Sequence, residues 1–140
     1  MMIFSQYCDT LEYLADTPSA AAIALDPDHG PGHEFAFDHC LLLQVSVETG
    51  DLPATVAHAA KAVRRIGRHT GAKQLLISGF AGFAAPDRRP DPAAARAVLT
   101  ALHERLATPE WLVYDAPFGW EKRWRLEVQP GVWAQRVTWL

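Results

Sequence analysis

The sequence predicts a mixed α/β domain in which one β-sheet is layered with two main helices. Two observations support this. Between residues 41 and 114 the hydrophobic pattern alternates as strand, helix, strand, helix, strand, the order of two right-handed crossovers. Two further strand-like runs close the chain at about 121–128 and 132–139 and predict an antiparallel hairpin. At 140 residues we expect a single domain, residues 1–140.

Composition excludes several classes of protein. The net charge is −3, so any contact with nucleic acid requires a local basic patch. Two cysteines without a CxxC motif argue against a disulfide framework and fit a reducing cytoplasm. No apolar run is long enough to span a membrane. The nucleotide-binding and hydrolase signatures GxGxxG, GxxxxGK[ST] and GxSxG are absent, and we expect no cofactor.

The N-terminal third mixes strand and turn signals. Residues 2–7 predict a strand, Asp9 and Thr10 predict a turn, and residues 11–14 predict a short returning strand. Residues 15–34 appear irregular by pattern.

A loop rich in glycine and proline lies at 26–33. It contains His29 and His33, and His39 lies nearby. One alternative is that these three histidines bind the metal ion of a metal-dependent hydrolase. Their spacing matches no ligand pattern, which favours a surface loop and no metal.

The middle of the chain gives the clearest elements. Residues 35–48 predict a long central strand, and Asp51 is a suitable N-cap for a helix from about 52 to 69, with Gly71 as its C-cap. The cations Lys61, Arg64, Arg65 and Arg68 form a stripe on this helix. The stripe is either an ordinary solvated face or a contact for phosphates.

Two glycines follow the next buried strand, residues 73–78. They begin and end Gly79-Phe80-Ala81-Gly82 and would let backbone approach a ligand closely, unless the segment is only a connector. Asp91-Pro92 begins a second helix, and residues 111–114 predict the next strand.

Residues 116–125 contain the most informative stretch. Pro117 and Gly119 predict a turn, after which Lys122, Trp124, Leu126 and Val128 share one side of a strand. The Lys122 side chain either reaches solvent from the strand end or holds an oxygen of a ligand. Since ligands gather at the carboxyl ends of strands in open α/β sheets, we expect 79–82 and 116–119 to meet at one edge.

Four tryptophans crowd the C-terminal part of the chain, Trp120, Trp124, Trp133 and Trp139. Core packing is their expected use, with a dimer face or a stacking platform as the alternative.

The chain resembles the archaeal-type editing domain of threonyl-tRNA synthetase over nearly its whole length. The motifs are Asp9, Glu12 and Tyr13 for D-x-x-E-Y, residues 46–48 for S-V-E, residues 80–81 for F-A, and 116–122 for A-P-F-G-x-x-K. The resemblance implies the D-aminoacyl-tRNA deacylase-like fold and hydrolysis of serine from threonine tRNA.

The resemblance also implies site residues. Lys122 matches the family lysine, and Val47, Ala81 and Phe118 match positions that line the pocket for the terminal adenosine and the aminoacyl group. The backbone of Gly79 to Gly82 would frame the aminoacyl group. Phe80 and Pro117, which belong to the matched motifs, complete the expected substrate-binding set.

Three polar family residues are replaced. Gly82 stands for the family histidine, Glu121 for the tyrosine before the lysine, and Gln135 for a glutamate of the last strand. Loss of the histidine would widen the pocket, and Glu121 is a candidate general base.

We therefore predict a freestanding, homodimeric, cytoplasmic deacylase, with Lys122 and Glu121 catalytic and Gln135 in the substrate pocket. It would act on the 3′ end of a tRNA, with a threonyl-tRNA synthetase as a possible partner in trans. The alternative is a non-catalytic relative that binds an aminoacyl or adenosine-like ligand, or a protein partner.

Overall fold

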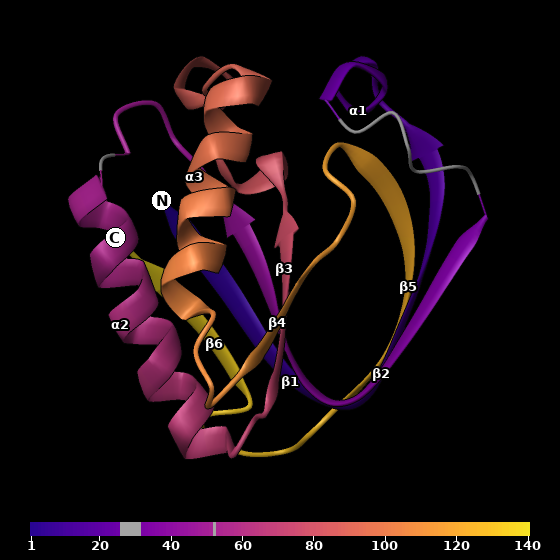
Figure 1. Cartoon of the computed structure of the whole chain (residues 1–140), viewed down its shortest axis with the longest axis vertical. Helices are drawn as coiled ribbons and strands as arrows, with labels where there is room; N and C mark the ends of the chain where they lie inside the picture. The colour runs from indigo at the N-terminus through magenta and orange to yellow at the C-terminus, as the bar shows by residue number, and fades with distance from the viewer. Residues whose placement is uncertain (26–31, 52) are drawn as a thin grey trace.

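A computed structural model describes residues 1–25, 32–51 and 53–140 (Figure 1). In chain order the elements are β1 (Met2–Pro18), α1 (Ala20–Leu25), β2 (His33–Ser46), α2 (Pro53–Thr70), β3 (Gln74–Gly79), the 3₁₀ turns η1 (Ala81–Phe83) and η2 (Pro86–Arg88), α3 (Pro92–Leu106), β4 (Leu112–Asp115), β5 (Trp120–Val128) and β6 (Gln135–Trp139).

The sheet confirms the mixed α/β class and its strand–helix core. Strand order is β4-β3-β2-β1-β5, and β6 also pairs with β1. β2, β3 and β4 are parallel and are joined by α2 and α3, as the alternating pattern predicts. β2 lies in the middle of the sheet, as its apolar run Leu41–Leu43 indicates.

The predicted C-terminal hairpin is wrong in its pairing. β5 and β6 do not pair with each other: β5 lies antiparallel to residues 8–18 of β1, and β6 lies antiparallel to residues 2–6. The reason is the length of β1, whose 17 residues leave room for two short strands in succession along one edge. Between them, the Gln129 N–H donates to the Tyr7 carbonyl and keeps the chain against β1.

The turn predicted at Asp9 and Thr10 is also wrong, because β1 runs through it. Pairing with β2 continues on both sides of this point, from Cys8–Cys40 to Thr10–Asp38. The sequence signal marks a bend instead. His39 has φ +51°, and the pairing with β5 shifts by one residue between Cys8 and Thr10, so both long strands change the face that they present. Of the predicted irregular stretch 15–34, residues 15–18 extend β1 and Ala20–Leu25 form α1.

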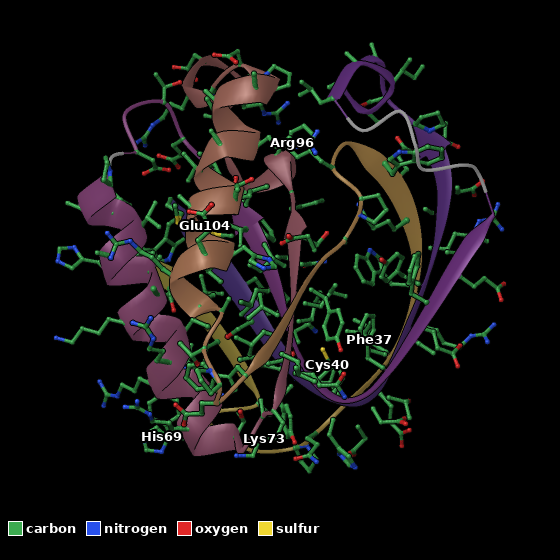
Figure 2. The ribbon with its side chains drawn as sticks, in the orientation of Figure 1. Phe37, Cys40, His69, Lys73, Arg96 and Glu104 are labelled. Carbon is green, nitrogen blue, oxygen red and sulfur yellow. The ribbon has the colours of Figure 1, made fainter. Side chains whose placement is uncertain are left out.

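The bend lets the sheet carry a core on each face. On one face, α2 and α3 pack on Leu41, Leu43 and Leu75. On the other, Leu11, Leu42 and Leu76 lie beneath the outer halves of β1 and β2, which sweep away with β5 in Figure 1. The rings of Phe37 in β2 and Tyr114 in β4 lie 5.1 Å apart although β3 separates the two strands. The sheet therefore curls over the second core, where Figure 2 shows Phe37 and Cys40.

Two of the three predicted helix ends, at Asp91 and Gly71, have the expected chemistry, whereas the described bonds of Asp51 go to residues before α2 rather than into it. The Asp91 carboxylate accepts from the Ala94 N–H at 2.9 Å and caps α3, and Gly71 after α2 has φ +74°. The Asp51 carboxylate accepts from the Glu48 N–H at 2.8 Å and from the N-terminal ammonium of Met1 at 2.9 Å. The chain start is thereby fixed to the entry of α2. No helix in the described residues is long and apolar enough to cross a membrane.

Candidate active site

A cavity of about 310 Å³ lies at the carboxyl ends of β2 and β3. Its walls come from the strand ends, the turn before β5, the start of α1, and the loop leading into α3. The lining residues are Ser19, Ala21, Val45, Val47, Gly79, Phe80, Ala81, Arg89, Pro90, Pro92, Ala95, Leu99, Phe118 and Gly119. The prediction that residues 79–82 and 116–119 reach one edge of the sheet is confirmed.

Strand hydrogen bonds hold both segments at this edge. The Phe80 N–H donates to the Val45 carbonyl at 2.9 Å, which continues the pairing of β3 with β2. The Ala116 N–H donates to the Ile77 carbonyl at 2.8 Å, which continues the pairing of β4 with β3. The cavity walls are therefore direct extensions of the parallel sheet.

Gly79 is required by the packing of α3. A Cβ atom at this position would lie 2.9 Å from Leu99 Cδ1 and 3.8 Å from the Phe118 ring. Leu99 projects from α3 and Phe118 from the turn before β5. Because Gly79 has no side chain, α3 and this turn can both pack against the end of β3. The sequence predicted that this glycine would let backbone approach a ligand, and the structure shows that it also lets Leu99 and Phe118 approach the backbone.

Gly82 has a different steric role. A Cβ atom there would lie 2.6 Å from Cζ of Phe80, whose ring folds over this glycine and meets Phe83 edge-on at 4.6 Å between centroids. Gly82 itself does not line the cavity. The Phe80 ring thus occupies the space into which a side chain at position 82 would project, and the widening of the pocket stays a prediction.

Gly119 joins the turn to α1. Its φ of +73° favours glycine, and a Cβ atom there would lie 2.8 Å from Ser19 Oγ and 3.0 Å from the Ala22 nitrogen. The Gly119 carbonyl accepts from the Ser19 N–H at 3.0 Å, and Ser19 Oγ accepts from the Ala22 N–H. Trp120 then packs against Ala15 and Ala22. These hydrogen bonds and packing contacts fix one wall of the cavity.

Arg89 is a cavity residue that sequence reasoning missed. It is the one charged residue among the described residues that line the cavity, and its Nε donates to the Ala84 carbonyl at 3.1 Å. The neighbouring Arg88 pairs with Glu48 at 2.5 Å, and its carbonyl accepts from the Thr49 N–H. Its place in the sequence could have indicated this role, since Arg89 and Pro90 directly precede the Asp91 helix cap at the edge of the sheet where ligands bind.

Lys122 lies outside the cavity lining. It stands opposite Ala15 in the β1–β5 ladder, and its ammonium donates to the Trp120 carbonyl at 2.7 Å. Burial lowers the pKa of Lys122 from 10.5 to about 8. The prediction that it opens the inward side of the strand is confirmed by the burial pattern of β5. Lys122 is not among the lining residues, so contact with a bound ligand requires its side chain to swing away from Trp120.

The other expected site residues, Pro117, Glu121 and Gln135, are not among those that line the cavity. Pro117 is buried in the turn between lining neighbours. Glu121 is exposed and points to the opposite side of β5 from Lys122. Gln135 is exposed at the start of β6, paired with Gln6, and lies outside the cavity lining. The structure thus brings together Val47, Gly79, Phe80, Ala81 and Phe118, and leaves the three polar candidates outside.

The opening motif is structural. Asp9 Oδ1 accepts from Gln129 Nε2 at 2.6 Å at the bend of β1, and Glu12 pairs with Arg125 at 3.2 Å. Tyr13 is buried and stacks on Phe35 at 4.9 Å. These residues hold β5 against β1, and so position Lys122, without touching the cavity.

The histidine alternative lies largely outside the described residues. His29 falls within 26–31, and the side chain of His33 is not among those described. His39 is exposed, with Nδ1 3.6 Å from Asp9 Oδ1. Within the described residues no group of three or more histidine, cysteine, aspartate or glutamate side chains is arranged to hold a metal ion.

The tryptophans divide between core and surface. Trp120 is buried, and buried Trp111 donates its indole N–H to the Ala72 carbonyl at 2.9 Å. Trp139 is 69% exposed at the end of β6, beside half-exposed Val137.

Chemically, the cavity suits a small, largely apolar group with one anionic or polar attachment. Aliphatic and aromatic walls would exclude water from an enclosed ligand, which strengthens every polar interaction made there. Arg89 supplies a cation among the lining residues, and the partly desolvated ammonium of Lys122 lies outside that lining. Backbone at a strand end and a few polar groups in an apolar hollow are typical of a small-molecule site.

Comparison with known proteins identifies relatives. Residues 1–135 match the family model of the archaea-specific editing domain of threonyl-tRNA synthetase. The chain is 35% identical over 94 residues to a threonine–tRNA ligase of Thermofilum pendens and 30% identical over 129 residues to one of Cenarchaeum symbiosum. These matches cover 66% and 92% of the chain but only 15% and 20% of the ligases.

The solved structure of the c-Myc DNA unwinding element binding protein superposes with a TM-score of 0.70 at 13% identity, and the match covers 100% of this chain and 99% of that one. At that identity the likeness shows the fold alone. The two proteins therefore share one mixed α/β fold over their whole length.

Proposed function

Since this chain belongs to the archaea-specific editing-domain family of threonyl-tRNA synthetase, we propose that it hydrolyses the ester of a mischarged aminoacyl-tRNA, with seryl-tRNA(Thr) the first substrate to test. The observation that carries the proposal is the meeting of Val47, Ala81 and Phe118 around one cavity at the carboxyl ends of the strands. These residues, far apart in the sequence, match the family's pocket positions, and their apolar walls are suited to an aminoacyl-adenosine end.

The reaction needs a positioned water and a donor to the oxyanion that forms as water attacks the ester carbonyl. The backbone of 79–82 frames the aminoacyl group at the strand end. Arg89 provides a cation within the cavity for the ribose–phosphate side of the ligand. In this scheme binding energy from the adenosine orients the ester for attack.

Lys122 is proposed as the oxyanion donor. Its ammonium donates one hydrogen bond to the Trp120 carbonyl, and burial destabilises its positive charge. A developing oxyanion is a stronger acceptor than a neutral carbonyl, so the side chain gains by turning toward it as the transition state forms. Glu121 is proposed only as a base acting through water, because its side chain lies on the other side of β5.

The test is a deacylation time course on seryl-tRNA(Thr), comparing wild type with Lys122→Ala. We expect the variant to lose about 100-fold in kcat, the scale for removing one oxyanion donor. Lys73→Ala, which removes a lysine at the opposite end of the sheet (Figure 2), is the matched control and should retain wild-type rates. Equal rates for wild type and Lys122→Ala would remove Lys122 from the mechanism.

We propose action in trans by a freestanding homodimer. Support for pairing comes from β6, where Val137 is 50% and Trp139 69% exposed on a strand that pairs only with β1 among the described strands. Light scattering of Trp139→Ser against wild type tests this: a dimer that becomes monomeric supports the proposal, and a wild-type monomer contradicts it. Cytoplasmic location stays a prediction.

A second candidate is a relative that binds an aminoacyl-adenosine ligand without hydrolysing it. It is favoured by the positions of Glu121 and Gln135 outside the cavity and by the bond from Lys122 to the Trp120 carbonyl. Titration with a non-hydrolysable seryl-adenosine analogue separates the two: saturable binding with no turnover of any mischarged tRNA favours this candidate, and turnover that depends on Lys122 excludes it.

A further inference from the structure

A second hollow, of about 730 Å³, lies between the outer side of α2 and β6. We call it the α2–β6 groove. Its described lining residues include no aspartate or glutamate, and its cations are Lys61, Arg64, Arg65, Arg68 and Arg136. The chain as a whole carries a net charge of −3, so this surface is strongly positive against an acidic background.

The groove is organised by helix periodicity. Val56, Ala59 and Val63 of α2 face the core, and the cations recur at steps of three and four on another side. At 1.5 Å per residue the stretch from His58 to His69 is roughly 16 Å long. Because α2 connects two parallel strands, it begins near the cavity edge and ends at the opposite edge, where Figure 2 shows His69.

Trp133 holds two of the cations in place. Its ring stacks on His69, with 4.0 Å between centroids and an interplanar angle of 7°. The guanidinium carbons of Arg65 and Arg136 lie 5.3 and 4.8 Å from a Trp133 ring centroid. The ring is therefore already in contact with three side chains, which makes it a support for the guanidiniums and leaves little surface for stacking a nucleobase.

The charges differ in how far they are already paired. Arg68 lies 3.8 Å from Glu110, and Arg64 donates to the Arg105 carbonyl. Lys61, Arg65 and Arg136 are exposed and have no acidic partner among the described residues. Two guanidiniums beside one ring, from α2 and β6, and a lysine of α2 are groups that bind phosphate well, and an arginine that rests on an aromatic ring loses less side-chain freedom on binding.

We propose that the α2–β6 groove binds the phosphate backbone of the helical part of the tRNA whose 3′ end enters the cavity. Lys61 lies midway along α2 and Arg68 near its far end, so an RNA whose 3′ end enters the cavity would reach these cations by running along the helix from the cavity edge. With Trp133 already occupied and no acidic lining residue, the groove contacts phosphates and reads no bases. The inference rests on the proposed function for the identity of the RNA, but not for the phosphate contacts themselves.

The test uses the whole chain and an uncharged RNA hairpin that copies a tRNA acceptor stem and ends in CCA. Fluorescence anisotropy across a salt series gives the affinity and its salt dependence for wild type, for Arg65→Gln/Arg136→Gln, and for the matched control Arg123→Gln/Arg125→Gln. The control removes two exposed arginines of β5 that pair with Asp16 and Glu12 of β1 and do not line the groove, and it changes net charge equally. Its urea midpoint, compared with that of wild type, shows whether β5 stays against β1.

We expect the groove variant to bind the hairpin about tenfold more weakly at moderate salt. The slope of log affinity against log salt should fall by roughly two, one for each phosphate contact. The control should keep the wild-type slope. Equal affinity in the groove variant and wild type overturns the proposal, as does weaker binding with an unchanged salt slope, because phosphate contacts must alter the slope. Lys61→Gln supplies an independent variant, with an expected slope change of roughly one.

Failure of this proposal is distinguishable from failure of the proposed function. Hairpin binding that depends on Arg65 and Arg136 without any deacylation contradicts only the hydrolase assignment. Deacylation with hairpin binding that is insensitive to both groove variants, Arg65→Gln/Arg136→Gln and Lys61→Gln, contradicts only the groove.

Discussion

The cavity and the α2–β6 groove differ in which part of the chain forms them, backbone in the first and exposed side chains in the second. The cavity is fixed by backbone, through strand-end hydrogen bonds and glycines at 79 and 119 that admit close neighbours. The groove is built from exposed side chains on a finished helix, ordered by one tryptophan. Substitutions in a site fixed by backbone should change its geometry and the stability of the fold. Substitutions in a site made of surface charges should change the affinity for a ligand and the dependence of that affinity on salt.

Substitution of Gly119 should have the largest effect. Gly119→Ala places a Cβ at φ +73° and within 3.0 Å of the Ala22 nitrogen, so we expect the free energy of unfolding to fall by roughly 1–3 kcal/mol. The displaced turn should also lower kcat/KM on seryl-tRNA(Thr) by about 100-fold. Urea unfolding and deacylation measure the two effects. Gly131→Ala, at φ +130° with no neighbour within 4 Å, controls for backbone strain away from the cavity.

Removal of the cavity cation should have a smaller effect. For Arg89→Gln we expect KM for the aminoacylated end to rise about tenfold, as for loss of one charged hydrogen bond, with kcat changed less. Steady-state kinetics on seryl-tRNA(Thr) measure the two constants. Arg88→Gln, whose side chain pairs with Glu48 and does not line the cavity, is the neighbouring control. A KM shift as large in Arg88→Gln would show that the loop, rather than the Arg89 charge, is responsible.

The pH dependence of Lys122 tests a charge that belongs to neither hollow. Because burial lowers its pKa from 10.5 to about 8, the folded protein loses this proton near pH 8 while the unfolded chain keeps it to near pH 10.5. If the ammonium is the oxyanion donor, kcat should fall as pH rises through about 8. A flat profile to pH 9, corrected for spontaneous ester hydrolysis, would contradict that role.

The same shift has a consequence for stability. The unfolded chain binds more protons between pH 8 and 10.5, so this group makes the fold more stable as pH rises through that window. Lys122→Met should therefore be more stable than wild type at pH 7, and the difference should shrink by pH 10. Urea midpoints at the two pH values provide the measurement, and a difference that grows with pH would show that the sign is wrong.

The smallest effect should come from Trp133. Trp133→Leu leaves every groove charge in place and removes the ring beside Arg65 and Arg136, so hairpin affinity should fall only about two- to fivefold, with an unchanged salt slope. Anisotropy on the same hairpin measures it. A slope change as large as that of the double arginine variant would mean that the ring does more than order the guanidiniums.

Local signals predicted the regular parts of the fold. The Leu41–Leu43 run, the Asp91 cap and the Gly71 turn are each decided by neighbours in the chain, and all three are as expected. The errors fall where pairing partners are distant. A turn-like Asp9-Thr10 becomes a bend because β1 is paired along both edges there, and two adjacent C-terminal strands separate because one long strand can accept both.

The candidate site divides in the same way. Sequence alone placed 79–82 and 116–119 at one edge, because parallel strands end together. It missed Arg89, because only the packing of its loop against Glu48 and Thr49 directs that residue to the cavity. It also did not predict that the Phe80 ring would cover Gly82, a contact that depends on how the segment after β3 folds back.

The sequence by itself determined the order of strands and helices from residue 35 onward, the family, and the inward side of Lys122, since periodicity and motif are properties of neighbouring residues. Tertiary structure alone decided that Gln135 lies outside the cavity lining, that Arg65 and Arg136 meet at Trp133, and that Lys122 bonds the Trp120 carbonyl. These are contacts between segments, or conformations imposed by burial. No local pattern encodes them, because their energies exist only once the sheet has curled and the helices have packed.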